Sequence, residues 1–349
     1  MEYFKFLYKS QPSIEINLNS VNHNPFEYIT KENKIIKYPT FYDNDEISGN
    51  IELKLNSNKS LIYEDVSIFL YGKITITNST TSKIVTEIFK ESQDLTEKKS
   101  PNIITNEITN FNFNFSPKVK PYETYIGNLI QINYCIKAII KTNNVNYPNL
   151  IEKEIDIACI KPGKKIICDE IYLKRKEKNN IEINIGVENI IHVRLNLLSV
   201  KLFLDDVIVG KIKIIKSEIE LNNIYVTIKK EEKYYQLDNV LVKNEDISNY
   251  EIAEGFIEQG DEICFKYFLR NIKNLTPSYD YKDDNKNKIS VKYYLCFCFN
   301  DSQGYQFFKY IEIYIYRMNL SDMNKGQKNF ISVKKLINNN DKKKFLKKS

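Results

Sequence analysis

The chain has 349 residues, of which 42% are hydrophobic and 28% charged, a balance typical of a folded globular protein and not of a disordered one. Its length suits about two domains of roughly 150 residues each. No stretch approaches the roughly 18 uninterrupted apolar residues of a membrane-spanning helix, and the apolar stretch at the N-terminus is too short for a signal peptide. We therefore expect a protein of the cytosol.

The net charge of +6 is concentrated at the C-terminal end. Residues 325–349 contain nine lysines and one acid, a surplus of eight positive charges that exceeds the charge of the whole chain. Residues 1–324 are therefore close to neutral, which argues against a nucleic-acid-binding face there. We expect a solvated, disordered tail over 321–349, with membrane contact that is weak or indirect.

Alternating apolar and polar residues predict strands along most of the chain. The pattern is plainest over residues 111–115, where three phenylalanines alternate with two asparagines. The chain has only three alanines and many Ile, Tyr and Phe residues, which also favours strands over helices. Further strands are predicted at 66–71, 130–140, 193–204, 211–215, 224–228, 263–269, 289–299 and 311–316. Without helical periodicity between them, these strands indicate antiparallel β-sandwiches.

Three sequence features recur in the same order about 160 residues apart. The pattern Asp-x-Ile-x-Gly-x-Ile begins at Asp45 and again at Asp206, and a proline precedes both the strand at 130 and the strand at 289. Each glycine predicts a bulge or a close backbone approach in an edge strand. The repeat favours two similar sandwiches over two unrelated ones.

The joint between the sandwiches is predicted within residues 155–180, where a strand is followed by Pro162, Gly163 and a charged run at 174–180. The predicted fold class is all-β, with two tandem antiparallel β-sandwich lobes. The predicted boundaries are 1–165 for the first lobe, 166–320 for the second and 321–349 for the basic tail.

The sequence contains no pattern that predicts an enzyme, a metal centre or a cofactor site. Six cysteines, none in a Cys-x-x-Cys pair, are predicted to be buried small hydrophobes in a reducing compartment. The two histidines, His23 and His192, are isolated, and there is no nucleophile elbow, Gly-rich phosphate loop or His-Glu-x-x-His motif. A protein that acts by binding is the better prediction.

Five blocks of sequence, in one order, resemble a known family. They are residues 120–127, 185–192, 206–212, 250–252, and the pair of segments 276–277 with 291–295. Together they resemble the vacuolar protein sorting-associated protein 26 family, the arrestin-like subunit of the retromer complex, over about residues 40–317. The resemblance implies an arrestin-like pair of lobes, no catalytic activity and a role as an adaptor that retrieves cargo from endosomes to the Golgi network.

The resemblance also implies a docking site on the second lobe. In this family a loop whose end carries a Tyr-Glu-Ile block binds the helical-solenoid subunit, vacuolar protein sorting-associated protein 35. The matching positions are Tyr250, Glu251 and Ile252. The next position, usually a large apolar residue, is Ala253, so the resemblance implies that neighbours such as Phe256 or Ile257 contribute to binding.

A second implied site would accept a sorting nexin and a hydrophobic motif from a cargo tail peptide. The matching positions are Ile185 and Phe308, both apolar, as a groove for a hydrophobic anchor requires. The alternative for each is ordinary core packing. The implied location is the cytoplasm and, peripherally, the cytosolic face of endosomes.

Two other classes of function stay open. One is an arrestin-like adaptor outside retromer, such as the paralogous subunit of the retriever complex or an arrestin-domain trafficking protein. The other is a binder of nucleic acid or membrane surfaces, which only the lysine-rich tail supports.

Overall fold

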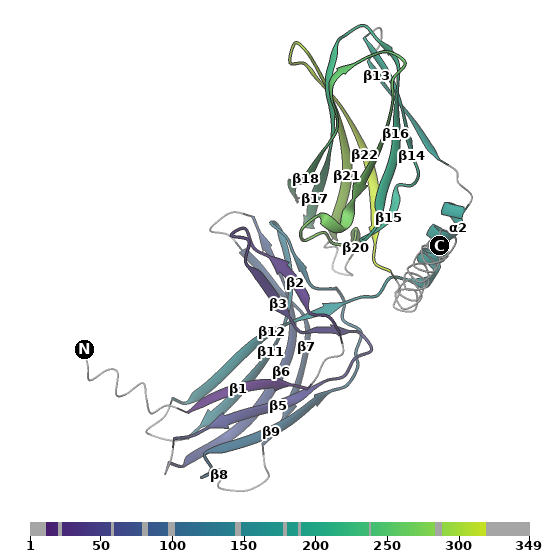
Figure 1. Ribbon diagram of the computed structural model, residues 1–349. Helices are drawn as coiled ribbons and strands as arrows, with labels where there is room; N and C mark the ends of the chain where they lie inside the picture. The colour runs from purple at the N-terminus through teal and green to yellow at the C-terminus, as the bar shows by residue number, and fades with distance from the viewer. Residues whose placement is uncertain are drawn as a thin grey trace, which may run out of the picture. The chain divides into compact units, whose positions relative to one another are not determined.

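The computed structural model describes residues 12–19, 23–56, 59–78, 83–96, 102–143, 148–176, 180–187, 190–236, 239–282 and 288–318. The chain divides into two compact units, Met1–Lys161 and Pro162–Ser349, and each is described by itself (Figure 1). The predicted boundary at 165/166 lies at the start of a helix of the second unit. The lysine-rich tail lies outside the described residues.

The first unit is a sandwich of two mostly antiparallel sheets, with β2 and β3 paired in a small separate sheet. A smaller sheet has the order β1-β5-β9, and a larger sheet has the order β4-β12-β11-β6-β7 with β8 and β10 attached. Its strands are β1 (Ser13–Leu18), β2 (Phe26–Ile29), β3 (Ile35–Tyr38), β4 (Thr40–Tyr42), β5 (Ile47–Lys54), β6 (Leu61–Thr77), β7 (Lys83–Asp94), β8 (Asn102–Ile104), β9 (Ile108–Phe115), β10 (Tyr125–Ile126), β11 (Ile130–Thr142) and β12 (Leu150–Ile160).

The second unit repeats this arrangement. Its smaller sheet has the order β13-β14-β16-β19, and its larger sheet has the order β15-β22-β21-β17-β18 with β20 attached. Its elements are α2 (Lys165–Lys176), β13 (Ile181–Val187), β14 (Ile191–Leu197), β15 (Lys201–Phe203), β16 (Val207–Ser217), β17 (Leu221–Gln236), β18 (Asn239–Ile257), β19 (Glu262–Phe268), a short 3₁₀ helix (Leu269–Asn271), β20 (Tyr279–Lys282), β21 (Lys288–Asp301) and β22 (Gln306–Tyr316).

The predicted all-β sandwiches are confirmed, and their cores follow from the alternation seen in the sequence. In β9, Phe111, Phe113 and Phe115 are buried, while the asparagines between them face outward. Strand β6 alternates in the same way along most of its length. Because successive side chains on a strand point to opposite faces, this pattern gives each sheet one apolar inner face and one polar outer face.

The sequence repeat corresponds to a repeat of hydrogen bonds. The carboxylate of Asp45 accepts a bond from the backbone N–H of Tyr42, and that of Asp206 accepts one from Phe203, in the turns that lead into β5 and β16. Each turn follows a short strand, β4 or β15, that pairs in parallel with the end of β12 or β22. The predicted repetition of the two lobes is therefore visible in their local structure.

The two repeated glycines are sites of close approach. Gly49 lies opposite Phe113 and Gly210 opposite Phe265 in the paired strands. A Cβ at Gly49 would lie 2.1 Å from the backbone oxygen of Asn17, and a Cβ at Gly210 would lie 2.4 Å from Cζ of Phe265. The close approach was predicted, but the edge-strand position was wrong, because β5 and β16 each have a neighbour on both sides.

Three other expectations differ from the structure. The predicted strand at 193–204 is two strands, because β14 ends at Leu197 and β15 begins at Lys201 in the other sheet. Helix α2 was missed, because its inner face has only Ile167, Cys168 and Ile171, too few apolar residues to show a helical period. Cys264 is exposed on β19, whereas the other five cysteines are buried as predicted.

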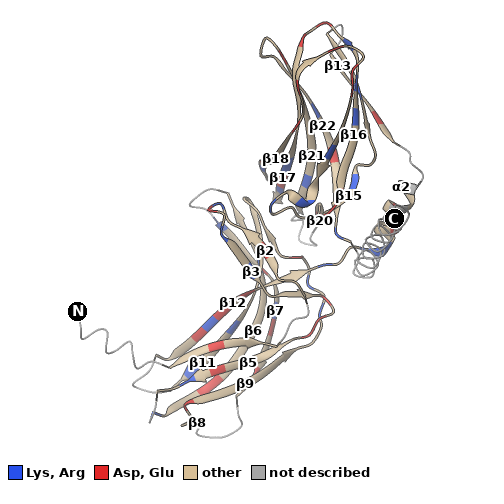
Figure 2. Cartoon of the chain, in the orientation of Figure 1, with Lys and Arg blue, Asp and Glu red and all other residues tan. Residues whose placement is uncertain are grey.

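Figure 2 shows Lys and Arg residues interspersed with Asp and Glu residues along the strands of both units. This distribution agrees with the near-neutral charge of residues 1–324. Among the described residues, no helix has the length and apolar character needed to cross a membrane.

The crossing at Gly210 gives a stability prediction. In Gly210→Ala, the added methyl group meets the ring of Phe265, which in turn contacts Phe297 with ring centroids 5.8 Å apart. Overpacking of this kind should lower the free energy of unfolding of the full chain by about 1–3 kcal/mol in urea denaturation. In Gly210→Ala/Phe265→Leu the two losses should be non-additive by at least about 0.5 kcal/mol. Simple additivity of the two substitutions would contradict the close approach.

Candidate functional site

Strand β18 is an edge strand of the larger sheet of the second unit. It is 19 residues long and lies last in the strand order, paired with β17 on one side (Figure 1). Along its other side, no strand of the described residues pairs with it. An edge strand carries a row of unpaired backbone groups, which makes it a template for binding another chain.

Irregularities in its pairing shape this edge. Ile224 lies opposite Ala253 and Tyr225 opposite Glu251, so Ile252 has no residue directly opposite it. A similar shift leaves Ile247 without an opposite residue. Bulges of this kind interrupt the flat edge that favours aggregation, and they aim single side chains in new directions.

The predicted docking block lies inside β18, not at the end of a loop. Tyr250 points inward and stacks on Tyr267 of β19, with ring centroids 5.1 Å apart and planes 18° apart. Glu251 is exposed, whereas Ile252 and Ala253 are half-buried. Of the four residues, Tyr250 therefore joins the two sheets, and Glu251 is the most exposed.

The most exposed apolar side chains of β18 lie at its two ends. Val240 and Val242 are 49% and 47% exposed, and Phe256 is 69% exposed. Phe256 follows Gly255, whose positive φ of 98° turns the strand just before it. Ile257 is buried, so Phe256 is the available one of the two neighbours named from the sequence. The two valines were not named from the sequence, where Asp238 and Asn239 precede them and Lys243 and Asn244 follow.

A buried ion pair holds the middle of β18. Lys230 of β17 lies 2.8 Å from the carboxylate of Glu245 on β18 and 3.3 Å from that of Glu232, which is 1% exposed. Burial alone would lower the pKa of Lys230, but its bond to Glu245 and the charge of Glu232 outweigh burial and raise it. Lys230 therefore stays charged inside the sandwich and ties β18 to its neighbour.

A surface hollow of about 720 Å³ adjoins the Tyr250 stack. Its lining comes from β14, β16, β18 and β19, with Leu198 and Val209 as apolar side chains and Lys211 and Lys266 as basic ones. Lys211 is already paired with Glu262. The hollow therefore extends the mixed apolar and charged surface beside β18.

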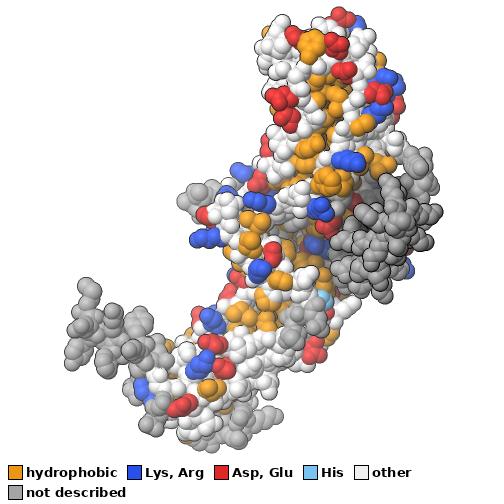
Figure 3. Space-filling model, in the orientation of Figure 1, with side chains coloured by type: hydrophobic (Ala, Val, Ile, Leu, Met, Phe, Trp, Pro, Cys, Tyr) orange, Lys and Arg blue, Asp and Glu red, His pale blue; other side chains and the backbone are white. Residues whose placement is uncertain are grey.

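The two predicted groove residues face different sides of the second unit. Ile185 of β13 is 8% exposed and lies opposite the buried Val193, so its side chain points into the core. Phe308 of β22 is 50% exposed and lies on the outer face of the larger sheet with Tyr310. Phe308 is thus the one of the pair whose side chain is exposed. Figure 3 shows hydrophobic side chains running along the visible face of this unit between charged ones.

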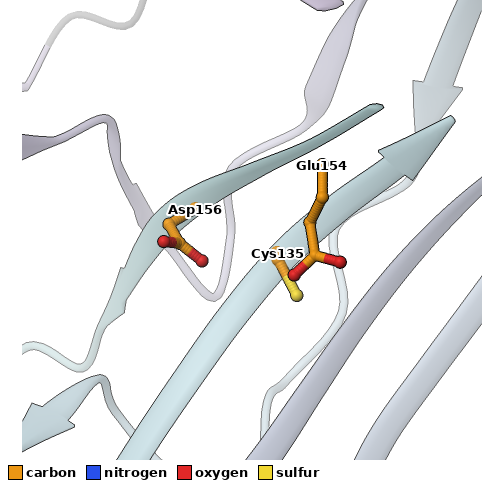
Figure 4. Close-up of side chains that lie close together, drawn as sticks. All are labelled: Cys135, Glu154 and Asp156. Carbon is orange, nitrogen blue, oxygen red and sulfur yellow. The ribbon is translucent and has the colours of Figure 1, made fainter. Parts of the chain in front are cut away.

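One cluster of potential metal ligands lies in the first unit, on the outer face of its larger sheet. The ligand atoms of Cys135, Glu154 and Asp156 lie within 4.8 Å of one another (Figure 4). Burial raises the pKa of the Cys135 thiol to about 12, which disfavours the thiolate form. Glu154 accepts a hydrogen bond from the hydroxyl of Tyr71. The cluster is best explained as a hydrogen-bonded group that joins three neighbouring strands.

The two histidines are also accounted for by structure. Nε2 of His23 lies 2.9 Å from the carboxylate of Asp45, and its ring meets Tyr42 edge-on. His192 lies within β14, with Nε2 3.4 Å from the amide oxygen of Asn184. In these contacts the ring partners are a carboxylate, a tyrosine ring and an amide oxygen.

Comparison with known proteins identifies the family. The family model for vacuolar protein sorting-associated protein 26 matches residues 8–304. The chain belongs to the Vps26 family. The chain is 27% identical over 312 residues to the Plasmodium falciparum protein of that name, which covers 89% of this chain and 97% of that protein. It is 30% identical over 306 residues to Vps26B of mouse and of human, covering 87% of this chain and 84% of each relative.

Family membership places the chain among proteins of vacuolar protein sorting. The matched residues include β18 and Ile185, whereas Phe308 lies beyond them. The family resemblance stated from the five sequence blocks is therefore confirmed over most of the chain.

The Tyr250–Tyr267 stack gives a prediction about how β18 is held. Tyr250→Ala removes the ring that joins β18 to β19 and should lower the free energy of unfolding by about 2 kcal/mol, whereas Tyr250→Phe, which keeps the ring, should cost less than about 1 kcal/mol. Equal losses for the two variants in urea denaturation would assign the effect to the hydroxyl group and contradict the stacking account.

Proposed function

We propose that this chain is a non-enzymatic adaptor subunit of a retromer-type complex. In this proposal it binds a helical-solenoid subunit of the vacuolar protein sorting-associated protein 35 type and helps to select cargo for retrieval from endosomes to the Golgi network. The observation that carries the proposal is the edge strand β18, which has exposed apolar side chains and bulges in a chain of the Vps26 family.

The chemistry of β18 indicates what kind of surface it fits. Its apolar positions, Val240, Val242 and Phe256, need apolar contacts on the partner. Between them stand several acidic side chains, Asp246, Glu251 and Glu254, that are exposed. A groove between two helices with a basic rim would satisfy both, because apolar anchors enter the groove and charges meet at the rim.

The second proposed contact is with a sorting nexin and a cargo tail peptide. Phe308 supports it, because its half-exposed ring stands beside Tyr310 on an outer face that no described strand covers. Ile185 would contribute indirectly, because its buried side chain holds β13 against the core. In this proposal the chain works in the cytoplasm and on the cytosolic face of endosomes as a peripheral component.

Substitution in β18 tests the docking proposal. Ile252→Asp and Phe256→Asp each place a charge at an apolar contact and should weaken binding of the solenoid subunit by about 3 kcal/mol, which is more than a hundredfold in Kd. Val85→Asp on β7 of the first unit is the matched control, because Val85 is 61% exposed on another edge strand. The measurement is calorimetric titration of the full chain with the purified solenoid subunit.

The proposal requires that both β18 variants lose binding while their unfolding transitions stay within about 1 kcal/mol of the unsubstituted chain. Unchanged affinity in both variants would overturn the assignment of β18. Affinity capture of endogenous partners from the source cells distinguishes retromer from retriever. Recovery of a retriever subunit in place of the retromer solenoid would refute the retromer proposal.

A further inference from the structure

Helix α2 has two apolar faces, and the described residues cover only one of them. Cys168 and Ile171 are each 1% exposed and pack with Phe203 of β15, together with Ile167, Tyr316 and Met318. On the other side of the helix, Ile166 is 83% exposed and Leu173 is 60% exposed. Residues seven apart lie on one face of a helix, so these two side chains form a single exposed stripe.

Acidic side chains flank this stripe. With 3.6 residues per turn, Asp169 and Glu170 lie on either side of the line that joins Ile166 to Leu173. Glu170 is bonded to Nζ of Lys201 at 2.9 Å, and Asp169 is exposed. The stripe therefore suits an apolar segment that also carries a positive charge.

The C-terminal end of the described chain lies beside the start of this helix. The backbone N–H of Gly163 donates to the carbonyl of Met318 at 3.3 Å, and the thiol of Cys168 donates to the carbonyl of Arg317 at 3.8 Å. A Cβ at Gly163 would lie 1.7 Å from that same Arg317 oxygen, so only glycine permits this contact. Residues 319–349 therefore continue from a point next to α2.

The sequence of that continuation matches the stripe. Phe330, Val333 and Ile337 follow the spacing of one helical face, and Lys334 stands next to them on the same face. We propose that residues 330–337 dock on the exposed Ile166–Leu173 stripe of α2, with Lys334 facing Asp169. The lysines at 342–348 are then held close to the second unit.

The segment that follows Met318 is long enough for residues 330–337 to reach the stripe, and the tether makes the contact favourable. Phe330 lies twelve positions after Met318, and an extended chain of that length spans up to about 40 Å. Ile166 and Leu173 lie only about 10 Å apart along the helix axis. A tethered segment of this kind acts at an effective concentration of the order of millimolar, so even a small apolar contact is occupied.

Cross-linking within the full chain tests the proposal. Leu173→Cys and Val333→Cys are combined in a Cys264→Ser background, because Cys264 is the one native thiol that is exposed in the described residues. The control pairs Val333→Cys with Tyr305→Cys. Tyr305 is 66% exposed and stands just before β22, whose other end lies next to α2. A short bis-maleimide should join 333 to 173 at least ten times faster than 333 to 305.

Two further variants make the result specific. Phe330→Asp/Ile337→Asp should slow the cross-link between 333 and 173 at least fivefold, whereas Asn338→Asp/Asn339→Asp, which adds the same charge outside the apolar face, should leave it unchanged. Asp169→Lys should slow it as well. Equal rates at positions 173 and 305, or cross-links that join two chains in place of one, would overturn the proposal.

Discussion

The candidate docking surface depends on how an exposed edge strand is held in a fixed place. Two contacts tie β18 to the interior of its unit: the stack of Tyr250 on Tyr267, and the ion pair of the buried Lys230 with the half-exposed Glu245. The first joins β18 to the other sheet, and the second fixes its register against β17. Because its inner side is anchored in this way, the strand keeps its position while Phe256 stays exposed and Ile252 half-buried.

The internal repeat shows that the two units hold their edge strands, β7 and β18, by different kinds of contact. In the first unit, Gly72 lies opposite Tyr134, and the ring of Phe89 on the neighbouring strand contacts that tyrosine. The corresponding places in the second unit hold Lys230 opposite Tyr293, with Glu245 on the neighbouring strand. Where one edge strand is held by aromatic packing, the other is held by an ion pair. A slipped pairing would separate Lys230 from Glu245 and leave it with Glu232 of its own strand, so the ion pair favours one register.

The sequence predicted the strands and the two-fold repeat because both rest on local periodicity, as in the alternating phenylalanines of β9. It could not predict α2, whose buried face depends on Phe203 and Tyr316, residues far away in the chain. Nor could it predict which residues of β18 face outward, because each bulge shifts the alternation by one residue. Tyr250 and Ile252 are two positions apart, but the bulge at Ile252 means that they need not share a face. The family resemblance supplied the docking block, and only the structure separated the anchoring Tyr250 from Ile252.

We propose that β18 is the edge at which this Vps26-family chain meets its partner. Amide hydrogen exchange of the full chain, measured by mass spectrometry with and without the solenoid subunit, tests this claim directly, because backbone amides on the open side of an edge strand exchange fast until another molecule covers them. The account predicts slowed exchange across residues 239–257, with β7 of the first unit unchanged. Protection confined to other strands, with β18 exchanging as it does alone, would contradict it.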